Sequence, residues 1–252
     1  MLTSKHISTS LLAATLLIAG CGGGGGGGGA DQAAPAPAPS GPPDLVFELA
    51  LTNLTLAQPL SPPAIALHGS DYRAFVDGEP ASVALEILAE GGDRTDLLTE
   101  ITDSGELLAA YQDANPVGPL SIGPTEQLTV AADSADDLRL TVVTMLVHTN
   151  DAFTGINAAD VAGMAVGETR TFSGPTWDAG TENNTENAAT MPGPDFGGEG
   201  FAAVRDDIID RVRFHQGVVT SASLESGDPN SALAERHRFD NPTSRLSITR
   251  VQ

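Results

Sequence analysis

Leu138-Arg139-Leu140-Thr141-Val142-Val143-Thr144-Met145-Leu146 is a nine-residue run that opens with alternating apolar and polar side chains. Successive side chains of a strand point to opposite faces of a sheet, so this alternation predicts a half-buried strand. Arg245–Val251 alternates in the same way. Further strand-like runs cover Leu45–Leu51, Leu120–Ile122, Gln127–Ala131 and Glu168–Phe172. Turn-rich stretches separate these runs at moderate spacing, a pattern typical of β-sandwiches.

Two segments have helical rather than strand-like character. Pro80–Gly92 has proline near its start and glycine at its end, which are the residues that favour helix initiation and termination. Thr95–Ile101 is a second, shorter candidate helix. The sequence therefore predicts an all-β domain with one or two short helices in its connections.

Acidic residues follow the first quoted strand and recur about one hairpin later, in Thr149–Gly155 and Thr176–Glu182. Asp151, Asp178 and Glu182 supply three carboxylates, and Ca²⁺ in proteins is held by six to eight oxygen ligands. Gly180 lacks a Cβ, which lets the backbone between Asp178 and Glu182 turn sharply. The same residues also suit ordinary turns, because Asn and Asp bond to nearby backbone amides and Gly supplies positive φ. Residue types alone leave both interpretations open.

The two acidic segments carry a family resemblance. Thr144–Asp151 resembles the "SM-x-x-P-x-x-D" segment of the spondin amino-terminal domain family, and Trp177–Glu182 is similar to its "WDAGTD". Weaker similarities to the bacterial branch occur at Leu51–Thr55, Gln58–Pro63, His68, Phe75, Gly78–Ala81 and Gly198–Phe201. The resemblance extends from Leu45 to Val251. The family includes F-spondin, mindin and many bacterial single-domain proteins.

This resemblance implies an antiparallel β-sandwich, similar to calcium-dependent lipid-binding domains, with one Ca²⁺ at the end of the sheets. The resemblance also implies that Asp151, Asp178 and Glu182 are the ligands of this ion. The chain departs from the family pattern in having Glu182 where the family has Asp, and His148 and Thr149 where it has Pro and Ser. The disulfides of the animal members have no counterpart, because Cys21 is the single cysteine.

The amino-terminal residues predict export and lipid anchoring. Residues 1–20 combine a short basic region with an apolar stretch too short to span a bilayer, as in a lipoprotein signal peptide. Ile18-Ala19-Gly20-Cys21 resembles a bacterial lipobox, so Cys21 is the predicted lipidation site. Residues 21–43 form a Gly- and Pro-rich linker, and residues 44–252 the spondin-like domain. We expect a bacterial envelope location, at the outer membrane, with the domain in the periplasm or at the cell surface.

Composition excludes several classes of function. The formal net charge of −21 repels nucleic-acid phosphates and anionic headgroups, so we expect no nucleic-acid partner. The single cysteine excludes cysteine catalysis and Cys-ligated zinc after lipidation. The histidines lack the His-Glu-x-x-His spacing of zinc enzymes, and no Gly-x-Ser-x-Gly elbow is present.

These observations favour a lipid-anchored Ca²⁺-binding domain, not an enzyme, that mediates adhesion or contact with an extracellular protein or polysaccharide. One alternative is an extracytoplasmic glycan hydrolase that uses Asp151 and Asp178 as its acid and base. The low aromatic content, with a single Trp, argues against a sugar-binding cleft. Another alternative is a structural envelope lipoprotein without a specific ligand.

Overall fold

The computed structural model describes residues 42–112, 114–207, 209–222 and 229–252. The predicted signal peptide, the lipidation site Cys21 and nearly all of the linker lie outside these residues. No helix within the described ranges has the length and apolar character needed to cross a bilayer.

One of the two sheets has four strands in the order β4-β1-β10-β7, and every pairing is antiparallel. Its strands are β1 (Leu45–Asn53), β4 (Glu126–Val130), β7 (Thr169–Gly174) and β10 (Ser244–Arg250). Along β1 buried positions alternate with more exposed ones. This sheet therefore buries a single face, as the alternation in its sequence predicts.

The second sheet has six strands in the order β3-β2-β5-β6-β8-β9, again antiparallel. Its strands are β2 (Ala64–His68), β3 (Leu107–Tyr111), β5 (Arg139–Met145), β6 (Ala152–Asp160), β8 (Thr176–Asp178) and β9 (Arg213–Phe214). All residues of β2, and all of β5 after Arg139, are buried. Both faces of this sheet are therefore covered along β2 and most of β5.

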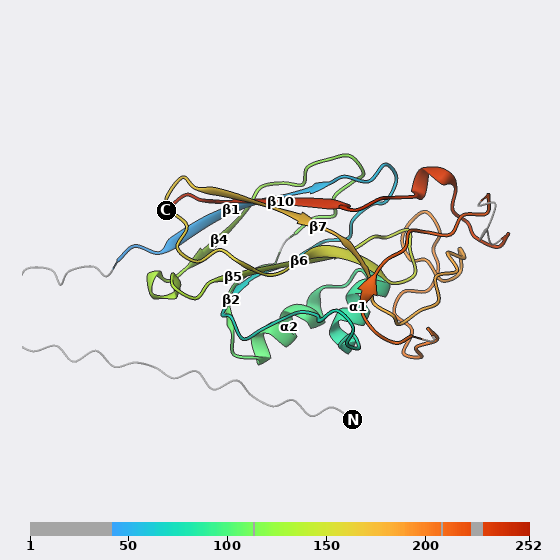
Figure 1. Ribbon diagram of the computed structural model, residues 1–252, viewed down its shortest axis with the longest axis horizontal. Coiled ribbons are helices and arrows are strands. Elements are labelled where there is room, and N and C mark those ends of the chain that lie inside the picture. The colour runs from blue at the N-terminus through green and yellow to red at the C-terminus, as the bar shows by residue number, and fades with distance from the viewer. Residues whose placement is uncertain (1–41, 113, 208, 223–228) are drawn as a thin grey trace, which may run out of the picture. The chain divides into compact units, whose positions relative to one another are not determined.

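Helices α1 (Val83–Gly91) and α2 (Thr95–Asp103) cover the outer face of the six-stranded sheet (Figure 1). The Ser82 side chain caps α1 by accepting a hydrogen bond from Leu85 N–H, and Gly92 ends it in a left-handed conformation. Both predicted helices are confirmed. Two 3₁₀ turns, η1 (Ala132–Ser134) and η2 (Glu235–His237), lie in connections.

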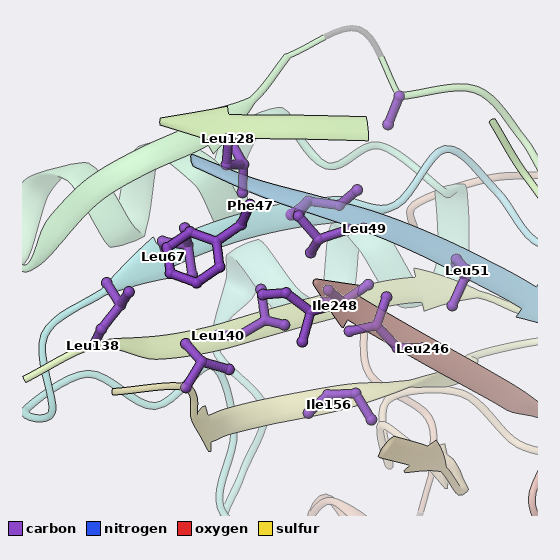
Figure 2. Close-up of a cluster of buried hydrophobic side chains, with 14 of the residues drawn as sticks. Phe47, Leu49, Leu51, Leu67, Leu128, Leu138, Leu140, Ile156, Leu246 and Ile248 are labelled. Atoms are coloured by element: carbon purple, nitrogen blue, oxygen red, sulfur yellow. The ribbon is translucent and has the colours of Figure 1, made fainter. Parts of the chain in front are cut away.

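Apolar side chains form two main layers. Between the sheets, Phe47, Leu49 and Ile248 from the four-stranded sheet face Leu67, Leu140 and Ile156 from the six-stranded sheet (Figure 2). A second cluster fills the space between the six-stranded sheet and the helices, and includes Ala66, Leu85, Leu88, Leu97, Val143 and Phe153. Sheet packed on sheet confirms the expected antiparallel β-sandwich.

Most predicted strands match observed ones to within two residues, with one error. Leu120–Ile122 is not a strand: Leu120 lies in a turn with a φ of 49°, and Ile122 makes only an isolated bridge to Thr52. A short apolar run cannot distinguish a strand from a turn whose side chains are exposed, and Leu120 and Ile122 are both exposed.

Candidate functional site

Strand pairing brings the two acidic segments together. β6 begins at Ala152, directly after Asp151, and pairs with β8 so that Ala152 lies opposite Asp178. The backbone carbonyl of Asp151 accepts a hydrogen bond from Ala179 N–H at 3.1 Å. The carboxyls of Asp151 and Asp178, 27 positions apart in the chain, thus come from neighbouring strand ends.

The turn after β8 brings Glu182 to the same place. Asp178 Oδ1 accepts a hydrogen bond from Gly180 N–H at 2.8 Å, and Gly180 has a φ of 76°. A Cβ at position 180 would lie 2.5 Å from the backbone N and O of Arg211. The turn directs the amides of Thr181 and Glu182 at Asp151 Oδ2, with distances of 2.8 and 3.1 Å. The expected role of Gly180 in bending this loop is confirmed.

All three predicted acids are buried: the exposed fractions of Asp151, Asp178 and Glu182 are 0%, 2% and 8%. Their carboxyl oxygens differ in the number of hydrogen bonds that they accept. Asp178 Oδ2 accepts hydrogen bonds from Asn184 Nδ2 at 2.7 Å and Arg213 Nη2 at 2.9 Å. Glu182 Oε2 accepts one from Asn150 Nδ2 at 3.3 Å. Asp151 Oδ1 has no hydrogen-bond partner among the described residues.

A fourth acid, Glu90 on α1, joins this group and was not predicted from the sequence. Its exposed fraction is 1% and its Oε2 accepts a hydrogen bond from Ala202 N–H at 2.8 Å, but its Oε1 is buried without a partner among the described residues. Glu86, one turn earlier, is neutralised by Arg205 Nη2 at 2.6 Å. The sequence feature that could have indicated it is the pair Glu86 and Glu90. These two acids are four residues apart on the helix face that also carries the buried Leu85 and Ala89.

Burial and mutual repulsion make these carboxyls weak acids. Loss of solvation, followed by the charge of Asp178, raises the pKa of Asp151 to about 7. Loss of solvation, followed by the charge of Glu90, raises the pKa of Glu182 to about 8. Burial also raises the pKa of both Asp178 and Glu90. A cluster of this kind either holds protons or requires a cation.

The donor chemistry fits a hard cation, because every candidate ligand is an oxygen and two of the oxygens lack partners. In the described part of the chain, however, no three Asp, Glu, His or Cys side chains converge closely enough to enclose a metal ion as they stand. An ion at Asp151 Oδ1 would therefore have to draw neighbouring carboxylates inward. Arg213, which bridges Asp178 and Asp207, is a competing cation at one side of the cluster.

His148 lies close in sequence but its ring is engaged elsewhere. Its Nδ1 lies 3.1 Å from the Ala57 carbonyl, its Nε2 lies 3.0 Å from Asp195 Oδ2, and its ring packs edge-on against Phe196. The burial of Asp151 and Asp178 also gives no support to a glycan hydrolase, because a saccharide cannot reach carboxyls that are at most 2% exposed.

A family model described as Spondin_N matches residues 58–196, which contain all four clustered acids. No curated protein matches the chain.

Proposed function

The chain belongs to the Spondin_N family, and from that membership we propose that it is a lipid-anchored extracytoplasmic domain that binds Ca²⁺ and mediates adhesion. The family supports an extracellular, non-catalytic, spondin-like domain. Calcium binding, anchoring through Cys21 and an adhesive role form our proposal. The residues that would hold the ion are Glu90, Asp151, Asp178 and Glu182.

The observation that carries the calcium proposal is the unpartnered oxygen of Asp151. A buried carboxylate oxygen without a partner is unfavourable, and the negative charges of Asp178 and Glu90 add to the cost of ionising Asp151. A bound divalent cation would supply the missing positive charge. Asp151 Oδ2 already holds the 178–182 turn through backbone amides, so its Oδ1 remains for the ion.

Such an ion would join parts of the chain that are distant in sequence. Asp151 precedes β6, Asp178 and Glu182 flank the turn after β8, and Glu90 lies in the last turn of α1. The ion would stabilise the long segment 178–200, and long loops held by a rigid scaffold commonly carry binding surfaces. We therefore place contact with an extracellular protein or polysaccharide at this end of the sandwich.

Thermal unfolding of the full chain tests the calcium site. Extracellular calcium modules have dissociation constants on the order of 10⁻⁴ to 10⁻³ M, and an excess of ten times that value stabilises the folded state by about 1.4 kcal/mol. We expect Ca²⁺ to raise the melting temperature by about 3–6 °C over a chelator control.

Asp151→Asn should abolish that response without unfolding the protein, because the Asn oxygen still accepts the amides of Thr181 and Glu182. Asp136→Asn makes the same chemical change at an exposed position and should keep the full response. Identical melting of the unsubstituted protein with Ca²⁺ and with chelator would refute the calcium proposal.

A further inference from the structure

A second feature of the molecule is a cavity of about 520 Å³ that none of the four clustered acids lines. Its apolar walls include Leu56, Pro59 and Phe196, and its polar groups include His148, Arg236 and His237. This volume lies within the range of small-molecule sites, roughly 300–1,000 Å³. Apolar walls with a few convergent polar groups are the usual composition of such sites.

The cavity lining contains one guanidinium, that of Arg236, in a chain of net charge −21. The carboxylate of Asp195, also in the lining, lies 3.0 Å from His148 Nε2. Arg236 has no ion-pair or hydrogen-bond partner within the described ranges. A guanidinium offers five donors in a planar fork that matches a carboxylate.

His237 adds a second donor beside Arg236. Its Nδ1 accepts a hydrogen bond from Ala234 N–H at 2.9 Å, so the ring hydrogen is on Nε2. Burial, and then the charge of Arg236, lower the pKa of His237, so the ring is a neutral donor near pH 7. Gln58 Nε2 donates to the backbone carbonyls of His148 and His237, at 3.1 and 3.0 Å. This single side chain fixes the two imidazole-bearing segments relative to each other.

We propose that this cavity binds an organic anion, specifically a carboxylate attached to an aromatic or branched aliphatic body. The carboxylate would pair with the Arg236 guanidinium and accept from His237 Nε2. The apolar body would pack between Leu56, Pro59 and Phe196. None of the four clustered acids lines this cavity, but Asp195 and Phe196 belong to the segment 178–200 that the proposed ion would stabilise.

The test is calorimetric titration of the full chain with 2-naphthoate, together with NMR of the His148 and His237 ring protons. We expect saturable binding at one site, with shifts of both histidine rings. Two further probes separate the contributions: 2-naphthalenemethanol lacks the charge and acetate lacks the rings. Each should bind at least about tenfold more weakly than 2-naphthoate, since a charge-assisted hydrogen bond or a buried ring contributes at least that factor.

Arg236→Gln should weaken 2-naphthoate binding by about tenfold or more. Arg238→Gln is the matched control, because Arg238 lies two positions along the chain, does not line the cavity and pairs at 3.7 Å with Glu235. It should leave the affinity unchanged. The absence of saturable binding, or equal weakening by both variants, would overturn the proposal.

Discussion

The carboxyl of Asp151 combines two roles that are normally found in different residues. Its Oδ2 organises a turn by accepting hydrogen bonds from two backbone amides, and its Oδ1 is buried without a partner among the described residues. The first role is the turn interpretation of the sequence, and the second is the basis of the metal proposal. The turn interpretation is therefore confirmed for Oδ2, and the metal interpretation of Oδ1 stays a prediction.

Glu90 provides the sharpest test among single residues. Glu90→Gln keeps an oxygen acceptor for Ala202 N–H and removes one buried negative charge. We expect the Ca²⁺-free protein to become more stable above pH 8 and its calcium affinity to fall by about tenfold, measured by calorimetric titration.

Glu86→Gln is the control for that variant, since Glu86 lies one helical turn away and is paired with Arg205. It should destabilise the protein, because it leaves the partly buried Arg205 with a weaker partner, and should keep the calcium affinity. Equal calcium affinity in Glu90→Gln and the unsubstituted chain would remove Glu90 from the site.

The raised pKa values of Asp151 (about 7) and Glu182 (about 8) predict an unusual dependence of stability on pH. In the unfolded chain both groups ionise near pH 4. The stabilisation that these two protonated carboxyls give the folded state is complete below about pH 4. It is lost as the pH rises through about 7 and 8, the pKa values in the folded protein. In chelator, the free energy of unfolding should therefore fall between pH 6.5 and pH 8.5, by on the order of 1 kcal/mol.

Urea unfolding at those two pH values measures this effect. Saturating Ca²⁺ should reduce the decrease, because the ion favours the ionised carboxylates. The pKa of His215 is lowered to about 4 by burial, so its contribution is lost at acid pH and stays outside this window. A free energy of unfolding that rises from pH 6.5 to pH 8.5 in chelator would contradict the raised pKa values.

Among the elements, the turn after β8 depends on Gly180. Gly180→Ala places a side chain at a φ of 76°, which costs about 1–2 kcal/mol, and sets its Cβ against the Arg211 backbone. We expect both lower stability and weaker calcium binding, measured by urea unfolding and by titration.

Gly78→Ala separates the two causes, because Gly78 has a φ of 85° but open space where a Cβ would stand. It should show the conformational cost alone and bind calcium normally. If the two variants have equal stability and equal calcium affinity, then close packing at Gly180 is unimportant.

Whether a strand could be predicted from the sequence depends on whether one or both of its faces are buried. β1, β7 and β10 were predictable because each alternates between a less exposed and a more exposed side. Ala64–His68 was missed as a strand because it is buried throughout and shows no alternation.

Asp151, Asp178 and Glu182 were found because they lie in two compact motifs. Glu90 is about 60 positions away on a helix, and only tertiary packing brings it near them.

At the scale of the whole molecule, anchoring is the prediction that can be tested most directly. Cys21→Ser removes the thiol to which lipid would be attached. We expect the unsubstituted protein to sediment with membranes and to incorporate labelled fatty acid, and the variant to do neither. Fractionation after expression in a Gram-negative host measures both. Membrane association that survives Cys21→Ser would show that another part of the chain is responsible.

Helices cover the outer face of the six-stranded sheet but not that of the four-stranded sheet, and this difference affects how the sequence can change during evolution. The outer side of β1 and β10 carries residues such as Glu48 and Thr249 that pack beneath no helix. Substitution there should be nearly neutral, so relatives are free to acquire new surface chemistry on that side. In β5, by contrast, every position after Arg139 is buried, and Leu140, Val142 and Val143 belong to the two apolar layers. Evolutionary drift should therefore be concentrated on one half of the sandwich, while the half bearing the acids changes slowly.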